Sequence, residues 1–405
     1  MMHPDKRLFM TTLPPHLAEL MGKPVNDIDT PALVIDLDAM RRNIGRLAEF
    51  AKKHNIRWRP HAKMHKSAAL ARMQIKAGAV GVCVQKAAEA EAMVAGAVYN
   101  VYISNQVIAP AKLARVAALT QRVAAHGGQI AIAVDSLEGV SRLAQAMTEA
   151  RTRTNTSTRE DSGAAPAATV IDVFVEIDVG QGRCGVAPGP AAVTLALEIR
   201  KHPALRFAGL QAYHGGAQHV RSALERQGVI AQAVAAVLRT RHLIAEQGMT
   251  VGLVTGAGTG TFALETASGV YGELQAGSFL FMDRDYAANE RDPAQPVFEH
   301  ALFVKSQVMS VCASHAVVDA GHKSHAIDSG LPAVHGLALD YANGGDEHGI
   351  LRGAVLPALG EAVWLIPGHC DPTVNLHDFM VGVRGGLQHG TVEQIIRVDS
   401  RGALT

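Results

Sequence analysis

Short apolar runs alternate with longer amphipathic stretches through most of this 405-residue chain. The runs are bounded by turn residues and are followed by segments with helical periodicity. We count these apolar runs from the one that follows the first predicted helix. They occupy 55–58, 80–84, 98–104, 130–135, 170–178, 207–213, 251–255 and 273–277. Apolar runs separated by helical crossovers are typical of the buried strands of a parallel sheet. Eight of them in succession favour an α/β fold with a closed (β/α)8 barrel.

The pattern changes after about residue 295. Strand-like runs with little helix between them, joined by loops rich in Gly, Pro and Asp, occupy 302–311, 316–319, 361–366, 379–383 and 392–398. These runs predict a second, mainly β domain, and we expect the early apolar run 33–37 to join its sheet. The predicted organisation is a lead-in at 1–28, a barrel domain at 29–295 and a β-rich domain at 296–405.

Two local features complete this pattern. Asp38 is predicted to cap the helix that follows the run 33–37 and continues to about His54. The polar segment 151–168, rich in Thr and Arg, interrupts the alternation of strands and helices. We interpret it as a flexible surface excursion between a helix and a strand.

Composition narrows the class of protein. Hydrophobic residues make up 48% and charged residues 19% of the chain, and the net charge of +1 indicates no polyanionic partner such as a nucleic acid. No apolar run approaches the roughly 18 residues needed to span a membrane, and residues 1–10 lack the apolar core of a secretory signal. The four cysteines show no pairing rhythm, so we expect a cytoplasmic protein. The 19 histidines invite a search for metal or acid–base chemistry.

The stretch RPHAKMHKS at 59–67 places Lys63 at the end of the first barrel strand. Barrels of this kind carry their chemistry at the carboxyl ends of the strands. A buried amine is costly unless its charge is paired or its pKa falls, and an amine of lowered pKa is a nucleophile for carbonyl groups. We expect the neighbouring His61, His65 and Lys66 to lower the pKa of Lys63 further. The alternative interpretation is an exposed basic turn.

A glycine-rich turn follows the seventh run. Gly258, Thr259 and Gly260, with Gly277 after the eighth run, offer backbone N–H groups and a hydroxyl to an anion. Barrels commonly bind phosphate between these two loops. Alone, such a turn is weak evidence. Together with a lysine at a strand end, it indicates pyridoxal 5′-phosphate held as a Schiff base.

The second domain contains the sequence His369-Cys370-Asp371. On extended backbone, His369 and Asp371 point the same way while Cys370 faces the other. An imidazole with a carboxylate suits a divalent metal such as Mn²⁺, with Mg²⁺ and Zn²⁺ as alternatives. Most His-x-Asp triplets are surface loops, which is the competing interpretation. The DEHG loop at 346–349 is either a second layer around such a metal or a solvated turn.

Taken in order, several motifs resemble the D-threonine aldolase family of pyridoxal phosphate enzymes, which is related to the D-serine dehydratases. The resemblance covers about residues 28–400. The motifs are DTPAL at 29–33, RPHAKMHKS at 59–67, VEIDVGQGRCGV at 175–186, QAYHGGAQH at 211–219, ELQAGSFLFMD at 273–283, DEHG at 346–349 and PGHCDPTVNLHD at 367–378. The resemblance implies a TIM barrel of the alanine racemase type, a mainly β C-terminal domain and a homodimer with the active site near the subunit interface.

The resemblance also implies roles for particular residues. Lys63 would bind the cofactor covalently, and His219 matches the histidine proposed as the base on the substrate hydroxyl. His369 and Asp371 match the metal pair, where related dehydratases typically present His-x-Cys. The further cofactor-binding residues would be Arg183 near the phenolic oxygen, Tyr213, and the phosphate cup of Gly258, Thr259, Gly277 and Ser278.

These matches imply an aldehyde-lyase that cleaves D-β-hydroxy-α-amino acids of the D-threonine type to glycine and an aldehyde. One alternative is a 3-hydroxy-D-aspartate aldolase, which would release glycine and glyoxylate. Another is a dehydratase of D-serine or 3-hydroxyaspartate, which would release a 2-oxo acid and ammonia. A non-catalytic pyridoxal phosphate carrier would need Lys63 and the phosphate turn but not the His369 and Asp371 pair.

Overall fold

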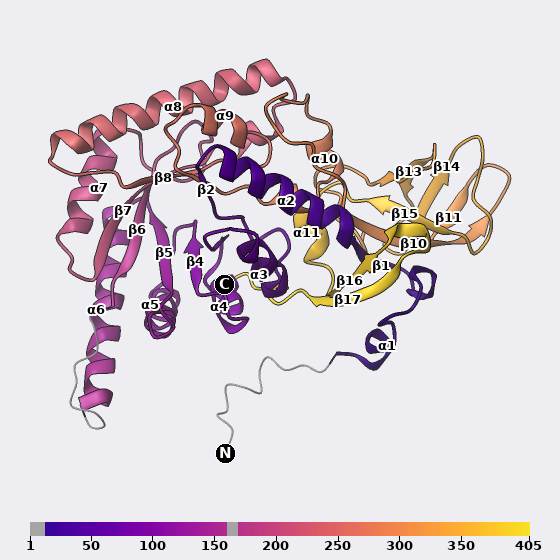
Figure 1. The fold of residues 1–405 in the computed structure, drawn as a ribbon, viewed down its shortest axis with the longest axis horizontal. Helices are drawn as coiled ribbons and strands as arrows, with labels where there is room; N and C mark the ends of the chain where they lie inside the picture. Colours follow the sequence, from indigo (N-terminus) through magenta and orange to yellow (C-terminus); the bar gives the residue numbers. More distant parts are fainter. Residues whose placement is uncertain (1–12, 160–168) are drawn as a thin grey trace.

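The structure is a computed structural model that describes residues 13–159 and 169–405, without the side chains of 154–159. Figure 1 shows a barrel of strands and helices beside a mainly β part coloured orange and yellow. The strands are β1 (Ala32–Asp36), β2 (Arg57–Trp58), β3 (Val82–Val84), β4 (Asn100–Ile103), β5 (Gln129–Val134), β6 (Ile171–Glu176), β7 (Leu205–Ala212), β8 (Leu253–Gly256), β9 (Glu273–Leu274), β10 (Leu302–Val311), β11 (Ala316–Val318), β12 (Ala333–Val334), β13 (Asp340–Asn343), β14 (Gly349–Arg352), β15 (Ala362–Ile366), β16 (Phe379–Arg384) and β17 (Thr391–Arg397). The α-helices are α1 (Pro15–Ala18), α2 (Leu37–Lys53), α3 (Ala68–Lys76), α4 (Ala87–Ala95), α5 (Pro110–Ala124), α6 (Leu137–Arg159), α7 (Pro190–Arg200), α8 (Ala223–Glu246), α9 (Phe262–Ala267), α10 (Arg284–Ala287), α11 (Cys370–Val374) and α12 (Gly386–His389).

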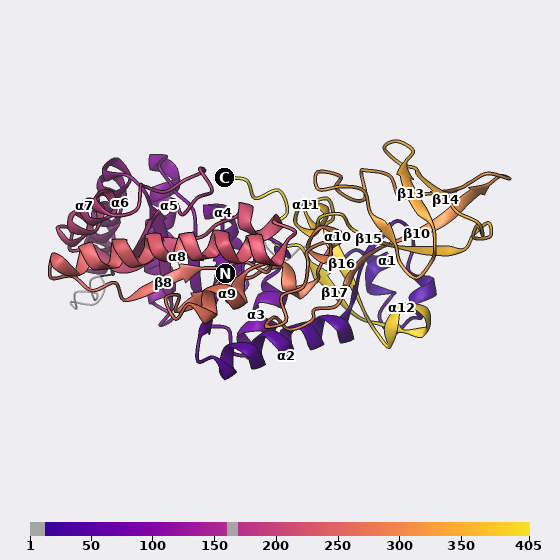
Figure 2. The same ribbon diagram turned by 90° about the horizontal axis from the view of Figure 1, so that it is seen from above.

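Eight parallel strands form the barrel sheet, in the order β2-β9-β8-β7-β6-β5-β4-β3. Backbone hydrogen bonds join its two ends: Cys83 N–H donates to the Pro60 carbonyl at 2.9 Å, and Ala62 N–H donates to the Cys83 carbonyl at 2.8 Å. Helices α4 to α8 surround the strands on the outside (Figures 1 and 2). The (β/α)8 barrel predicted from the hydrophobic pattern is therefore confirmed.

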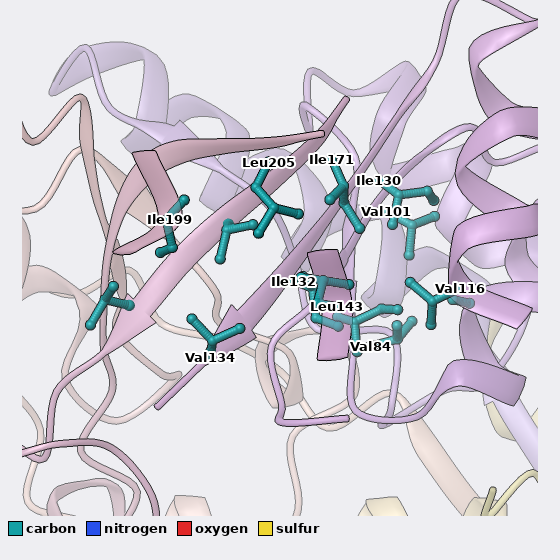
Figure 3. Packing of buried hydrophobic residues seen from close by; sticks show 14 of the residues in the cluster. Val84, Val101, Val116, Ile130, Ile132, Val134, Leu143, Ile171, Ile199 and Leu205 are labelled. Carbon is teal, nitrogen blue, oxygen red and sulfur yellow. The ribbon is translucent and has the colours of Figure 1, made fainter. Parts of the chain in front are cut away.

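Both faces of the barrel strands are buried. On the outer face, Val101 of β4 and Ile132 of β5 lie in one buried cluster with Val116 of α5 and Leu143 of α6 (Figure 3). The inner face carries a smaller cluster, which contains Cys83, Tyr102, Ala131, Ala133 and Phe174. Because successive residues of a strand point to opposite faces, a strand buried on both faces has the continuous apolar run seen in the sequence.

The second sheet belongs to the mainly β part of the chain. Its strands follow the path β13-β14-β11-β10-β1-β16-β17, and β15 pairs with β10 and β12. Strand β1 lies between β10, to which it is antiparallel, and β16, to which it is parallel. Figure 1 shows this indigo strand among yellow ones. A strand that precedes the barrel in the sequence is therefore built into the sheet that follows it.

One hydrophobic cluster crosses the junction between the two parts. It extends from Leu47 and Phe50 of α2 through Phe279, beside the barrel, to Leu302 of β10 and Leu365 of β15. Each such side chain contributes about 1.5–3 kcal/mol on full burial. The barrel mouth and the β domain are therefore held in a fixed relation by a shared core.

Two predicted boundaries are wrong. The cap of α2 is Asp36, whose carboxylate accepts hydrogen bonds at 3.0 Å from the N–H groups of Asp38 and Ala39. Helix α6 continues to Arg159, so the start of the segment interpreted as a surface excursion is helical. Residues 151–159 contain no Gly or Pro, and a polar stretch without these residues can extend an exposed helix. Residues 160–168 of that segment lie outside the described residues.

Strands β12, β13 and β14 are missing from the prediction. They have only two to four residues each, which is too short for the periodicity on which the prediction relies. Within residues 13–159 and 169–405, no helix combines the length and hydrophobicity needed to cross a lipid bilayer.

Lys305 of β10 is buried in the second sheet. Its Nζ donates hydrogen bonds to the backbone carbonyl oxygens of Val25 and Asn26 at 3.0 Å and of Ile28 at 2.5 Å. Burial lowers the pKa of Lys305, and the three carbonyls match the three donors of an ammonium group. Lys305 therefore fastens the segment before β1 to the sheet.

We expect Lys305→Met to lower the free energy of unfolding by about 3 kcal/mol, because it leaves three inward carbonyl groups without their donor. The control is Lys323→Met, at an exposed lysine that forms surface ion pairs, for which a loss below about 1 kcal/mol is expected. Urea unfolding followed by circular dichroism measures both, and equal midpoints for the two variants would contradict this role.

Candidate active site

A cavity of about 350 Å³ opens at the carboxyl ends of the barrel strands, a size suited to a small molecule. Its lining residues are His61, Lys63, Met64, Gln85, Ser104, Gln181, Arg183, Gln211, Tyr213, Gly215, Gly216, His219, Gly258, Thr259, Gln275, Gly277, Ser278, Tyr286 and His369. The site residues expected from the sequence line this cavity, except for two. Gly260 N–H is taken up by Gln218, so the expectation that it is open to an anion is wrong, and Asp371 contacts Lys63 directly. The chemistry-bearing residues of both domains therefore converge on one space.

The backbone around Lys63 is fixed at both ends. Before it, Arg59 N–H donates to the carbonyl of Leu274 at 2.8 Å and so continues the pairing of β2 with β9. After it, the N–H of Ala68 donates to the carboxylate of Asp399 at 2.8 Å. The C-terminal tail thus returns to the barrel, as Figure 1 shows near α4. These contacts hold the segment that carries Lys63 at the barrel mouth.

Lys63 forms an ion pair with the carboxylate of Asp371. Burial by itself would lower the pKa of the Lys63 amine, but the Asp371 carboxylate outweighs it, and the net effect is a raised pKa. The expectation of a lowered pKa for Lys63 is therefore wrong. The lysine charge is stabilised by a residue of the other domain, which no local sequence pattern reveals.

The neighbours of Lys63 do not crowd it with positive charge. Burial, assisted by the Lys63 charge, lowers the pKa of His61 well below its usual value. Burial also lowers the pKa of His65 to about 4, so both imidazoles are neutral near pH 7. Lys66 turns away and forms its own ion pair with Glu89, at 2.6 Å.

The ends of β8 and β9 form a cup of backbone donors. The N–H groups of Gly258, Thr259, Gly277 and Ser278 donate no hydrogen bond to any residue that the structure describes. A Cβ atom on Gly277 would lie 2.9 Å from the carbonyl oxygen of His61, closer than side chains pack. The cup is therefore open to an anion, and a side chain at Gly277 would narrow it.

Gln218 is hydrogen-bonded to the loops around this cup. Its side chain is fully buried, and its Oε1 accepts a hydrogen bond from Gly260 N–H at 2.9 Å. Its Nε2 donates to Thr261 Oγ1 at 2.8 Å and to the carbonyl of His214 at 3.2 Å. Gln218 thus joins the loop after β7 to the loop after β8. It lies in the QAYHGGAQH motif, but its buried position was not evident from the sequence.

Arg183 and Tyr213 lie together at the cavity mouth. Arg183 is on the loop after β6, which is shaped by Asp178 accepting hydrogen bonds from the N–H groups of Gly180 at 2.9 Å and Gly182 at 3.1 Å. Its guanidinium lies 5.9 Å from the centroid of the Tyr213 ring, within the range of a cation–π contact. Burial raises the pKa of Tyr213, so its hydroxyl stays protonated.

His369 is the N-cap of α11 and has extended backbone angles, whereas Asp371 lies in the first turn of that helix, so the two do not share the extended backbone that was expected. Even so, His369 Nε2 lies 3.8 Å from Asp371 Oδ1. That oxygen is buried and has no hydrogen-bond partner among the described residues. The other imidazole nitrogen, Nδ1, lies 2.7 Å from the carboxylate of Asp328. Cys370 faces away, with its Sγ 3.4 Å from the carbonyl oxygen of Met282.

Two donors are fewer than a complete metal site. In the described parts of the chain, no three His, Cys, Asp or Glu side chains converge in a metal-binding arrangement. The DEHG loop does not add to the pair, because Asp346 is exposed and pairs with His322 at 2.9 Å. Of the two interpretations of that loop, the solvated turn applies.

His219 ends a short 3₁₀ turn (Gly216–His219) at the cavity rim. Its Nδ1 lies 2.5 Å from one carboxylate oxygen of Asp285, and the other oxygen contacts Arg221. The rings of His219 and Tyr286 lie 5.4 Å apart. Asp285 and Asp328 were not identified from the sequence, since each approaches its histidine from a distant segment of the chain, Asp285 from α10 and Asp328 from a loop.

The sequence profile of the alanine racemase N-terminal domain matches residues 35–285, and that of a serine dehydratase domain matches residues 301–383. D-threonine aldolase from Arthrobacter sp is 43% identical over 94% of this chain and 95% of its own. The 3-hydroxy-D-aspartate aldolase of Paracoccus denitrificans (strain Pd 1222) is 39% identical over 95% of both chains. The crystal structure of D-threonine aldolase from Filomicrobium marinum has a TM-score of 0.87 and 44% identity, and the match covers 95% of this chain and 99% of that one.

A barrel of this kind joined to a mainly β domain is the fold of the alanine racemase-like enzymes. With identities above 40% over nearly the whole length, the chain belongs to the D-threonine aldolase family, a family of lyases. The resemblance drawn from the motifs is thereby confirmed.

The cysteines provide a test of the local geometry. Burial raises the pKa of the Cys370 thiol well above its usual value, whereas hydrogen bonds from Ser314 and His315 lower the pKa of the exposed Cys312. The thiolate is the reactive form. We therefore expect iodoacetamide at pH 8 to alkylate Cys312 in the native protein and to leave Cys370 unmodified.

Mass spectrometry of the digested protein measures this selectivity, with the unfolded protein as the control in which both thiols react. Alkylation of Cys370 as fast as Cys312 would place its sulfur in the cavity and would contradict the geometry of the His369 and Asp371 pair.

Proposed function

We propose that this enzyme cleaves D-β-hydroxy-α-amino acids of the D-threonine type into glycine and an aldehyde, with pyridoxal 5′-phosphate and a divalent metal. The observation that supports it most is the convergence of Lys63, the backbone cup and the His369 and Asp371 pair on one cavity. The family membership of the chain supports the same reaction class.

The cavity fits pyridoxal phosphate. Four backbone N–H groups in the cup have no acceptor in the described chain, which is what a phosphate dianion requires. Lys63 reaches the same cavity with its amine and would hold the cofactor covalently. Arg183 and Tyr213 would flank the ring, and Gly258, Thr259, Gly277 and Ser278 would hold the phosphate. The bound cofactor supplies an electron sink for the pair released from a broken bond at the substrate Cα.

The His369 and Asp371 pair fits one edge of a divalent metal site. Two donors that each lie about 2.0–2.2 Å from one ion can be at most ~4.4 Å apart, and the pair is 3.8 Å apart. The buried, unbonded Asp371 Oδ1 is a carboxylate oxygen in need of a cation. We propose Mn²⁺ first, with Mg²⁺ or Zn²⁺ as alternatives. Such an ion would act as a Lewis acid on the substrate hydroxyl.

The protein's own groups would carry the proton transfer. His219 Nε2 would accept the proton from the oxygen of the substrate β-hydroxyl, which breaks the O–H bond and leaves the oxygen to form the aldehyde carbonyl. A hydroxyl that has lost its proton is a poor leaving group. A base at this oxygen therefore favours cleavage of the Cα–Cβ bond over loss of water, and it favours an aldolase over a dehydratase.

A second candidate substrate is 3-hydroxy-D-aspartate, which would yield glycine and glyoxylate. Its support is the Paracoccus relative at 39% identity, together with Arg183, a cavity cation that makes no ion pair with any described residue. A substrate with a second carboxylate could use that charge.

We also propose a cytoplasmic homodimer. The four unpaired thiols agree with a reducing compartment, and the family resemblance supports the dimer. Sedimentation of the purified protein tests the assembly.

Product analysis tests the reaction itself. We expect the holoenzyme with Mn²⁺ to form glycine and acetaldehyde from D-threonine, none from L-threonine, and no ammonia. Comparison with 3-hydroxy-D-aspartate ranks the two substrates by kcat/KM. Ammonia and a 2-oxo acid in place of glycine would show a dehydratase and overturn the proposal. Lys63→Ala should lose both cleavage and the visible absorbance of bound cofactor, whereas Lys323→Ala, at an exposed lysine, should keep both.

Metal removal separates the roles of the two sites. We expect a chelator, or Asp371→Asn, to lower kcat by about 10²–10³-fold, because a Lewis acid contributes several kcal/mol to the transition state. The absorbance of bound cofactor should remain, and Mn²⁺ should restore the chelated enzyme but not the variant. Asp378→Asn, at an exposed aspartate paired with Arg401, is the control. Loss of absorbance together with activity would show that the metal is structural.

A further inference from the structure

The side chain of His219 is oriented by a carboxylate that the sequence motifs do not identify. His219 Nδ1 lies 2.5 Å from Asp285 Oδ2, and a carboxylate this close to one ring nitrogen favours the tautomer that carries its proton there. The proton of the neutral imidazole is thereby placed on Nδ1. Nε2 is left with its lone pair.

Nε2 is also the nitrogen available to a bound molecule. His219 lines the cavity, and its Nε2 forms no hydrogen bond with any residue of the described chain. The Tyr286 ring lies against the imidazole, at 5.4 Å between centroids and 46° between planes. This contact limits rotation of the imidazole away from Asp285.

Asp285 is itself held in place. Its second carboxylate oxygen contacts Arg221, whose other guanidinium nitrogen donates to Asn289 Oδ1 at 2.7 Å and to the Asp285 carbonyl at 2.6 Å. The Asp285 side chain is only 10% exposed. Burial would raise the pKa of Asp285, but Arg221 and His219 outweigh it and keep the pKa below its usual range. Asp285 is therefore a carboxylate throughout the neutral range.

We propose that Asp285 is the positioning residue of the aldolase reaction, which fixes His219 in the Nδ1–H form and stabilises the imidazolium that results when Nε2 takes the substrate proton. This inference rests on the proposed function, since it assigns a partner to the base of that reaction. The arrangement has the logic of an acid–base dyad, in which a carboxylate orients the imidazole and stabilises its charged form without taking the proton.

The other charged or titratable groups around His219 are few. Arg221 follows it in the chain and is paired with Asp285, and Tyr286 stays neutral because burial raises its pKa well above the usual value. From the α8 side, Arg226 donates to the carbonyl of Val220 at 2.6 Å, and Glu290 accepts from the N–H of Ala223 at 2.9 Å. Neither of these last two side chains pairs with the imidazole in the described chain, so Asp285 is its dominant electrostatic partner.

The test is Asp285→Asn in the holoenzyme with Mn²⁺ and D-threonine. The amide can donate to Nδ1 and so favours the wrong tautomer, and we expect kcat to fall about 10²–10⁴-fold. Asp285→Glu should recover activity to within about tenfold of the wild type, which a purely structural role would not require.

Asp346→Asn is the control, because it removes the carboxylate that pairs with another histidine, His322, at an exposed position outside the cavity. It should leave kcat unchanged. Cofactor absorbance and circular dichroism of each variant report on binding and folding.

A measurement on the wild type keeps the inference testable if Asp285→Asn does not fold. Nitrogen-15 NMR of histidine-labelled holoenzyme, with His219 assigned from its missing signal in His219→Gln, reports which ring nitrogen carries the proton in the neutral form. We expect Nδ1. A proton on Nε2, or an Asp285→Asn enzyme with wild-type kcat, overturns the inference. If the wild type forms no glycine from D-threonine, the proposed function fails instead, and the NMR result still stands on its own.

Discussion

The ion pair between Lys63 and Asp371 makes the site depend on both parts of the chain, although the two residues are 308 positions apart. An ammonium group set into a cavity is stabilised only if an opposite charge meets it, and either charge alone would be costly. The hydrophobic cluster that runs from α2 through Phe279 to β10 supplies the rigidity that keeps the two charges together. The amine that would bind the cofactor and the carboxylate that would bind the metal are thus placed by the same packing.

Beneath the mouth, the barrel is held together by buried polar contacts as well as by apolar ones. Arg59 donates to Glu273 at 3.0 Å, and Thr255 donates to the same carboxylate at 3.1 Å, so β2, β8 and β9 share one buried charge pair. Above it, Gln218 joins the loops after β7 and β8. Networks in which every member is hydrogen-bonded are rigid in a low-dielectric interior. The backbone cup for a phosphate and the loop that carries His219 therefore move little relative to each other.

Two histidines at the cavity share one arrangement, in which a carboxylate lies next to the Nδ1 atom of the imidazole. His219 contacts Asp285 through Nδ1, and His369 is hydrogen-bonded through Nδ1 to Asp328. In each case the carboxylate occupies one ring nitrogen and leaves Nε2 toward the chemistry, as is usual for histidines that act as bases or metal ligands. Under the proposed function, the same imidazole group would serve two purposes, as a base on the barrel side and as a metal ligand on the β-domain side, because the surroundings of Nε2 differ.

The hydrophobic pattern alone determined the eight barrel strands and the change to a β-rich C-terminal region. A strand that is buried on both faces appears in the sequence as a continuous apolar run. The motifs alone determined the family and pointed to Lys63, the glycine cup and the His369 and Asp371 pair, because these residue types and spacings lie within short segments.

Only the tertiary structure decided the charge state of Lys63 and the partners of His219 and His369. It also extended α6 and moved the cap of α2 to Asp36. These features depend on which distant loops meet, and the free energy of a contact between Lys63 and Asp371, or between His219 and Asp285, has no counterpart in local sequence.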